Sequence, residues 1–300
     1  MKTIVTHLSP DWDAIGGVWI IKRYLQGWEN ASVEFVPAGG RSPRVKDLPI
    51  DDAIQVVGHD EIIHVDTGLG PLDHHQTSDQ TQSGTGRAWE FVQEKRHQTG
   101  QYLKDSEEAA VSEVVRFIVD TDHFKEVFWP DAANARYEFT ILGLLEGMKY
   151  MRPDQHEYYV SWGMEILDCL AHTFENRLWA LREITQKGVE FKTKFGKGVA
   201  FETENDTVLK LAQKMGYVLV VRKDSDKGYV RIKVRPAQSK ETNIDLTPVY
   251  EAVQKADPKS TWYLHVSKKM LLNGSSKNPT SVSTTLKIPD LIEIIEKIYS

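Results

Sequence analysis

Short apolar runs alternate with helix-length amphipathic stretches over the first 125 residues. Strands are predicted over Lys2–His7, Val33–Pro37, Ile54–Gly58 and Ile62–Asp66, and helices over Asp13–Leu25, Gly86–Glu94 and Glu107–Val119. Alternation of strands and helices is typical of βαβ units. We therefore predict that residues 1–125 form an α/β domain with a mainly parallel sheet.

The rest of the chain divides into a helical segment and a second α/β segment. Residues 126–192 show no strand pattern, and Tyr158–Phe191 has the periodicity of one long helix, so this segment is expected to be a helical linker. Further on, strands are predicted up to Phe201 and over Tyr217–Val221, Tyr229–Val234 and Trp262–Val266, and helices over Asn205–Met215, Thr247–Ala256 and Pro289–Ile298. Residues 193–300 should thus form a smaller α/β domain.

Composition limits the class of protein. The chain has 300 residues, of which 40% are hydrophobic, and its single cysteine, Cys169, excludes an intrachain disulfide and a cysteine-based metal cage. The sequence contains no apolar run of the roughly 18 residues that a membrane helix needs. Two early aspartates, Asp11 and Asp13, interrupt any signal-peptide core. We expect a cytoplasmic protein that does not enter a membrane.

Charge is distributed unevenly along the chain. The net charge is −6, yet residues 193–300 carry 18 Lys and Arg against 12 Asp and Glu. Surface solubility alone can produce such a balance. The alternative is an acidic half that holds cations and a basic half that holds an anionic substrate.

Aspartates and histidines gather at the ends of the predicted elements. They occur in His7-Leu8-Ser9-Pro10-Asp11-Trp12-Asp13, at Asp66, in Asp73-His74-His75-Gln76 and in Asp120-Thr121-Asp122-His123-Phe124. In an open parallel sheet, the carboxyl ends of the strands border the ligand crevice. Carboxylates and imidazoles without a thiolate suit Mn²⁺, Mg²⁺ or Zn²⁺. A metal site is therefore expected there.

These motifs resemble the DHH phosphoesterase superfamily, whose members include RecJ exonucleases, nano-RNases, cyclic-dinucleotide phosphodiesterases and family II inorganic pyrophosphatases. The motifs follow the order of that family, and the resemblance covers the whole chain. The sequence departs from the family in two ways: Asp66 lies closer to His74 than in RecJ-like members, and the second domain lacks the Gly-Gly-Gly-His loop. The Asp-His-His-Gln string is more similar to the Myg-type RNA exonuclease branch.

The resemblance implies a centre with two metal ions, Mn²⁺ with Mg²⁺ as the alternative. It assigns His7 and Asp11 to one ion, Asp13, His74 and Asp120 to the other, and Asp66 to a bridge between them. It also implies that His75 faces the scissile phosphate and that Asp73 orients an imidazole. Asp122 and His123 are further candidate ligands.

The second domain carries weaker signals for substrate binding. Arg231, Lys233 and Arg235 alternate with apolar residues, so one strand face is basic, which suits either solvent or phosphate groups. His265 and the turn at Asn273, Gly274 and Ser275 stand where the family has its glycine-rich loop, and such a turn is either plain or an anion cradle. Trp262 and Tyr263 suit base stacking, although at least one should belong to the core.

Together these features predict a dinuclear-metal-dependent phosphodiesterase, a hydrolase that acts on RNA or short nucleic-acid fragments as an exonuclease releasing nucleoside monophosphates. One alternative is a phosphohydrolase of small anions such as pyrophosphate, polyphosphate, phosphoadenosine phosphate or a cyclic dinucleotide, because Ser267-Lys268-Lys269 resembles the basic motif of the pyrophosphatases. Another is a non-catalytic binding subunit with the same fold. The expected partner is an oligonucleotide substrate, and a homodimer is left open.

Overall fold

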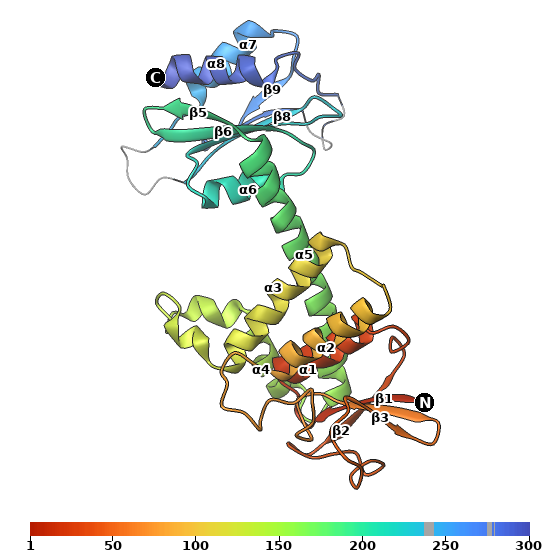
Figure 1. The fold of residues 1–300 in the computed structure, drawn as a ribbon. Helices are drawn as coiled ribbons and strands as arrows, with labels where there is room; N and C mark the ends of the chain where they lie inside the picture. The colour runs from red at the N-terminus through yellow and green to blue at the C-terminus, as the bar shows by residue number, and fades with distance from the viewer. Residues whose placement is uncertain (237–242, 275–277, 279) are drawn as a thin grey trace. The chain divides into compact units, whose positions relative to one another are not determined.

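The structure is a computed structural model that describes residues 1–236, 243–274, 278 and 280–300 (Figure 1). The chain divides into two compact units, residues 1–175 and 176–300. The division falls within α5 (His156–Lys187). The helical segment predicted over 126–192 therefore contributes residues to both units, and its role as a linker stays a prediction.

A four-stranded sheet organises the first unit. β1 (Lys2–His7) lies between β2 (Ser32–Val36) and β4 (Asp60–His64) and runs parallel to both, while β3 (Ile54–Val57) pairs antiparallel with β4. The predicted α/β class with a mainly parallel sheet is confirmed. The two central strands end at the same edge, where the sequence places His7 and Asp66.

Helices cover one face of this sheet. Ile4 and Ile63 point into a core shared with α1 (Trp12–Tyr24), α2 (Gly84–Gln98) and α3 (Asp105–Asp122). Their strand neighbours point the other way, into a smaller cluster formed by Val5, Val36, Val45 and Ile62. The helical layer is visible in Figure 1, where α1 and α2 lie side by side.

Glycine allows α1 to approach the sheet closely. A side chain at Gly17 would place its Cβ 1.9 Å from Cγ1 of Val65, the residue that precedes Asp66. Because both atoms belong to packed elements, any larger residue would push α1 away from the end of β4. The distance between the start of α1, which follows β1, and Asp66, which follows β4, therefore depends on this contact.

Some elements were missed by the sequence analysis. α4 (Ile141–Met151) follows the short 3₁₀ helices η1 (Lys125–Phe128) and η2 (Ala135–Phe139), and two glycines in α4 weaken its helical signal. The expectation that 126–192 holds no strand is wrong, because β5 covers Val189–Thr193. Val189 and Phe191 alternate with Glu190 and Lys192, but only Phe191 is buried, and the helix predicted up to Phe191 covered this short alternation.

The second unit contains a mixed six-stranded sheet in the order β5-β6-β7-β8-β10-β9, in which only β6 and β7 pair in parallel. Its remaining strands are β6 (Gly196–Glu202), β7 (Leu219–Lys223), β8 (Val230–Val234), β9 (Trp262–Leu264) and β10 (Met270–Asn273). β10 was not predicted. The smaller second α/β fold is confirmed.

Helices pack on both faces of the second sheet (Figure 1). α7 (Thr247–Ala256) and α8 (Ile288–Tyr299) share a core with the apolar face of β8. α6 (Thr207–Lys214) packs on the opposite face, against Val199 and Val220. Arg231 and Lys233 alternate with the apolar residues of β8, so they point to the face that carries α6.

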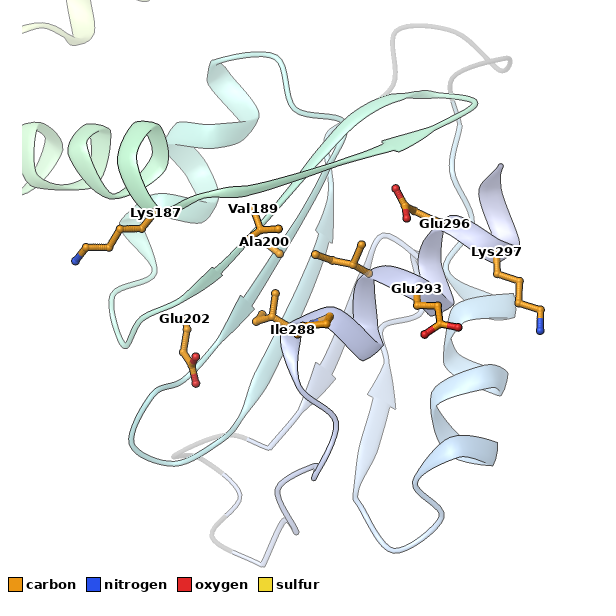
Figure 2. Close-up of a pocket in the computed structure, with 10 residues that line it drawn as sticks. Lys187, Val189, Ala200, Glu202, Ile288, Glu293, Glu296 and Lys297 are labelled. Carbon is orange, nitrogen blue, oxygen red and sulfur yellow. The ribbon is translucent and has the colours of Figure 1, made fainter.

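A cavity of about 720 Å³ lies between β5, β6 and α8 (Figure 2). Its apolar lining includes Val189, Ala200 and Ile288, with Glu202 and Glu293 beside them. None of the site residues predicted from the sequence lines this cavity. Among the residues that the structure describes, no helix combines the length and apolarity that crossing a membrane requires.

Asp257, which follows α7, ties the segment before α8 to the second unit. Its buried carboxylate accepts hydrogen bonds from the Thr285 N–H (2.8 Å), the Thr284 hydroxyl (2.8 Å) and the Thr285 hydroxyl (3.1 Å). The backbone bond of Thr285, followed by the Thr284 hydroxyl, lowers the pKa of Asp257. The charged carboxylate is therefore the form that stabilises the fold.

We expect Asp257→Ala to reduce the free energy of unfolding by about 2 kcal/mol at pH 7, because it removes hydrogen bonds to a charged group. The folded-state pKa lies below the unfolded value of about 3.9, so this contribution is present above about pH 4 and is lost as the pH falls through the folded pKa. Urea denaturation at several pH values, with the exposed Asp226→Ala as control, measures it. Equal stabilities of Asp257→Ala and wild type at pH 7 would contradict this role.

Candidate metal centre

The carboxyl ends of β1 and β4 bring two predicted residues together. His7 Nε2 lies 3.2 Å from Oδ2 of Asp66, whose side chain is 2% exposed. Asp66 adopts a left-handed conformation with φ 52°, and its N–H donates to the Leu72 carbonyl (3.0 Å). This conformation costs an aspartate roughly 1 kcal/mol and persists only where the surroundings enforce it. The turn after β4 therefore holds the Asp66 carboxylate at the strand ends.

Asp11 caps the helix that follows β1. Its Oδ1 accepts hydrogen bonds from the backbone N–H groups of Asp13 and Ala14, both at 3.0 Å. The same oxygen lies 3.8 Å from His7 Nε2. The spacing of His7, Asp11 and Asp13 in the sequence thus corresponds to a strand end, a helix cap and the first turn of a helix.

Asp13 is held by the start of α2, a contact that the sequence analysis missed. Its Oδ2 accepts the Gly84 N–H (2.6 Å) and its Oδ1 the Thr85 N–H (2.8 Å). A Cβ at Gly84 would lie 2.7 Å from the Asp66 Cβ, so only glycine fits there. Burial, followed by repulsion from Asp66 and Asp122, raises the pKa of Asp13 well above its usual value. The run of small residues at 83–86 is the signal in the sequence that could have indicated this contact.

His74 is surrounded by three carboxylates. Its Nε2 lies 3.4 Å from Asp122 Oδ2, 3.5 Å from Asp66 Oδ1 and 3.6 Å from Asp13 Oδ2. Among the described residues, His74 Nε2, Asp66 Oδ1 and Asp122 Oδ2 are buried without a hydrogen-bond partner. Ligand atoms about 2.1 Å from one cation lie roughly 3.0–3.5 Å apart. The donor set and its spacing therefore fit one divalent ion.

A second group of ligands adjoins the first and shares Asp66. His7, Asp11 and Asp66 offer ligand atoms within 4.8 Å of one another. Asp66 directs Oδ2 to His7 and Oδ1 to His74, so one carboxylate faces both groups. This is the arrangement that a ligand shared by two ions requires.

The raised pKa values of two histidines reflect the excess negative charge of the centre. Burial lowers the pKa of His7, but its contacts with Asp11 and Asp66 outweigh burial and raise that pKa to about 10. Contact with Asp66, together with the charges of Asp122 and Asp13, raises the pKa of His74 to about 9. The centre therefore stabilises positive charge, which divalent cations would supply.

The end of α3 brings Asp122, and not Asp120, to this centre. The Asp120 carboxylate is 41% exposed and pairs with Lys125 Nζ at 2.9 Å. Residues two apart on a helix point about 200° away from each other, so both cannot face one site. The predicted placement of Asp120 is corrected: Asp122 occupies that position, and we reassign the ligand role to it. His123 Nε2 lies 3.8 Å from Asp122 and 2.6 Å from the Gln82 carbonyl.

Asp73 and His75 form a pair beside the centre. His75 Nδ1 donates to Asp73 Oδ1 (2.7 Å), which also accepts the His75 backbone N–H (3.0 Å). Asp73 is fully buried, whereas the His75 side chain is 57% exposed. The structure thus brings the predicted pair together with Asp73 orienting the ring, and the catalytic role of His75 stays a prediction.

Arg231 in the second unit is committed to an ion pair. It contacts the Asp206 carboxylate, which also lies 2.9 Å from Nε of the buried Arg222. This contact leaves the basic face of β8 partly neutralised, whereas Arg235, directly after the strand, is exposed. The His265 ring contacts the Ser267 hydroxyl at 2.8 Å. Substrate binding by Arg231, Arg235 and His265 stays a prediction, which this placement favours only for Arg235.

Asn273 is used by the fold itself. Its side-chain amide donates to the carbonyls of Thr261 (2.9 Å) and Val282 (3.0 Å) and accepts the Thr284 N–H (2.8 Å). Both amide hydrogens are thereby occupied, so the expected anion-binding role is not favoured. Gly274 lies against the Tyr229 ring, and Ser275 lies outside the described residues.

The two aromatic residues of β9 differ in exposure, and one of them belongs to the core as expected. Trp262 is buried in the core, while Tyr263 is 56% exposed. Only Tyr263 therefore presents a ring to a ligand in solution.

Comparisons with known proteins give matches to solved structures only. No protein-family model and no curated protein matches the sequence. Solved structures that match include RecJ from Thermus thermophilus in complex with Mn²⁺, with 12% identity, a TM-score of 0.29 and coverage of 99% of this chain and 52% of RecJ. This chain therefore spans about half the length of that protein.

Two further matches cover nearly the whole of both chains. The pGpG-specific phosphodiesterase PggH from Vibrio cholerae shares 14% identity, with a TM-score of 0.29 and coverage of 92% and 94%. An exopolyphosphatase-related protein from Bacteroides fragilis shares 12% identity, with a TM-score of 0.25 and coverage of 99% and 90%. At such identities and TM-scores these matches assign neither a family nor a substrate to this chain.

We expect the two aspartates of α3 to differ in metal binding. Asp122→Asn should weaken Mn²⁺ binding by at least about 10-fold, because it removes one charged ligand from the His74 group. Asp120→Asn should bind Mn²⁺ like the wild type, because that side chain is 41% exposed and pairs with Lys125 instead of facing the centre. Calorimetric titration of both variants with Mn²⁺ measures this, and a loss confined to Asp120→Asn would refute the assignment.

Proposed function

We propose that this chain is a metal-dependent phosphodiesterase that hydrolyses RNA or short nucleic-acid fragments as an exonuclease and releases nucleoside monophosphates. The observation that carries the proposal is the convergence of three unpartnered, buried ligand atoms, those of Asp66, His74 and Asp122. Two divalent cations held by these residues, His7, Asp11 and Asp13 would lower the pKa of water and neutralise phosphate charge. The imidazole ligands favour Mn²⁺ over Mg²⁺.

The Asp73–His75 pair supplies a proton-transferring group next to this centre. Because Nδ1 of His75 donates to Asp73, the other ring nitrogen, Nε2, is available to a substrate. When Nε2 carries a proton, the ring donates a hydrogen bond to a phosphoryl oxygen, and the contact of Nδ1 with Asp73 holds the ring in that orientation. The exposed fraction of His75 leaves room for the substrate to reach it.

The contacts of the basic residues support a nucleic acid over pyrophosphate. The two lysines of Ser267-Lys268-Lys269 are used within the second unit: Lys268 lies 3.2 Å from Asp245, and Lys269 contacts the Ile244 carbonyl. Arg235 and Tyr263 are instead both exposed in the second unit, and a free cation and an exposed aromatic ring are groups that suit a phosphodiester chain. No observation on the described residues favours the small-anion substrate specifically.

The direct test is a hydrolysis screen with Mn²⁺ over single-stranded RNA and DNA oligonucleotides, cyclic dinucleotides and pyrophosphate. We expect mononucleotides to accumulate from the oligonucleotides from the first turnovers, because an exonuclease releases one residue at a time. Release of phosphate from pyrophosphate with intact oligonucleotides would favour the small-anion alternative. Inertness toward every compound despite bound metal would favour the non-catalytic subunit.

His75 and His74 should separate catalysis from metal binding. His75→Ala should keep its Mn²⁺ affinity and lose turnover by a factor on the order of 10²–10³, as expected when one donor to a developing charge is removed. His74→Ala should lose Mn²⁺. Metal content by elemental analysis and turnover of bis-p-nitrophenyl phosphate measure the two effects, and equal metal loss in both variants would contradict the assignment.

Arg235 should contribute to polymer binding alone. Replacing it with Ala should weaken oligonucleotide binding and reduce the slope of log affinity against log salt by about 1, because one phosphate contact is lost. Cleavage of bis-p-nitrophenyl phosphate should not change. Fluorescence anisotropy at several salt concentrations, with the exposed Lys227→Ala as control, measures the slope. Equal slopes for Arg235→Ala and wild type would show that Arg235 does not contact the oligonucleotide.

A further inference from the structure

A second cavity, of about 280 Å³, opens directly beside the metal centre. Asp11, Asp13 and Asp122 are among the residues that line it, so it adjoins the predicted ligands. Its apolar wall is formed by Trp12, Ile118, Leu142 and Leu145. One part of a substrate could therefore enter this cavity while a phosphate of the same molecule lies at the metal centre.

The segment after α3 contributes residues of η1 and α4 to the lining of this cavity. α3 ends at Asp122, and Phe124, in a left-handed conformation with φ 52°, turns the chain into η1, which carries Glu126. On α4, Leu142, Leu145 and Glu146 are spaced three and four residues apart and so share one helix face. The elements that the sequence analysis missed are thus those that close the cavity.

The charged side chains that line this cavity are all carboxylates. Glu146 at its edge is 63% exposed and lies 3.6 Å from Lys149, whereas Glu126 Oε2 is buried and has no hydrogen-bond partner among the described residues. Glu126 and Glu146, which are not among the predicted metal ligands, repel phosphate groups from their part of the lining. It suits a flat, uncharged group that stacks on apolar walls and donates hydrogen bonds to Glu126.

We infer that this cavity binds the base of the nucleotide whose phosphate lies at the metal centre, and that Glu126 selects guanine. The inference rests on the proposed function. A volume near the low end of the roughly 300–1,000 Å³ typical of ligand sites admits one nucleoside and not a chain. Guanine alone presents two adjacent donors, N1–H and the N2 amino group, to a carboxylate, while adenine and cytosine place an acceptor beside their amino group.

The test compares 5′-GMP with 5′-IMP, which lacks only the N2 amino group. Calorimetric titration of the Mn²⁺-loaded protein should show GMP binding tighter by a factor on the order of 10, the discrimination of one good bidentate contact. Glu126→Gln should abolish the difference while IMP affinity stays within about twofold. Glu138→Gln, the same change on the exposed η2, should behave like the wild type.

A second variant and the hydrolysis screen distinguish a failure of the base-binding cavity from a failure of the proposed function. Leu142→Phe narrows the cavity and should weaken both nucleotides, with Mn²⁺ binding unchanged. Equal binding of GMP and IMP by the wild type, or an unchanged preference in Glu126→Gln, overturns the inference even if oligonucleotides are cleaved. A GMP preference that depends on Glu126 in a protein that cleaves no phosphodiester supports the cavity and refutes only the proposed function.

Discussion

The close approach of two buried carboxylates, Asp13 and Asp66, is the constraint on which the first unit depends. Such a pair is stable only if the fold supplies hydrogen bonds or positive charge to both. Two N–H groups at the start of α2 bind Asp13, and His7 and His74 flank Asp66. The buried atoms left without partners then define where cations would complete the site.

The same constraint explains the position of the glycines. Gly84 lets the first turn of α2 reach Asp13 without displacing Asp66, and Gly17 lets α1 approach the end of β4. Close approach of three elements places ligands from a strand, a turn and a helix around one point. Because each ligand belongs to a packed element, its side chain is positioned before any ion binds, which is what precise coordination requires.

The sequence predicted the elements of the first sheet and most of the centre because both depend on local signals. Strand periodicity located His7 and Asp66, and topology implied that they meet. Asp120 was assigned wrongly because the motif does not indicate whether Asp120 or Asp122 faces inward at the end of the helix. The cavity lined by Glu126 and α4 was out of reach, since it depends on a left-handed Phe124 and on long-range packing rather than on periodicity.

The contacts of the second unit show the same limit. Alternation on β8 correctly indicated a basic face, but only the fold reveals that Asp206 neutralises Arg231. Likewise the turn-like string at Asn273 gave no sign that its amide would be saturated by the backbone of residues 261 and 282–284. Partners distant in the chain decide whether a polar residue is free to bind a ligand.

The central claim, that Asp66 joins two metal sites, is tested most directly by electron paramagnetic resonance of the protein titrated with Mn²⁺. Two ions about 3.5–4 Å apart are magnetically coupled. The account predicts two Mn²⁺ per chain and a coupled spectrum in the wild type, and an uncoupled spectrum with fewer bound ions in Asp66→Asn. A wild-type spectrum of isolated Mn²⁺ with one ion per chain at saturation would contradict it.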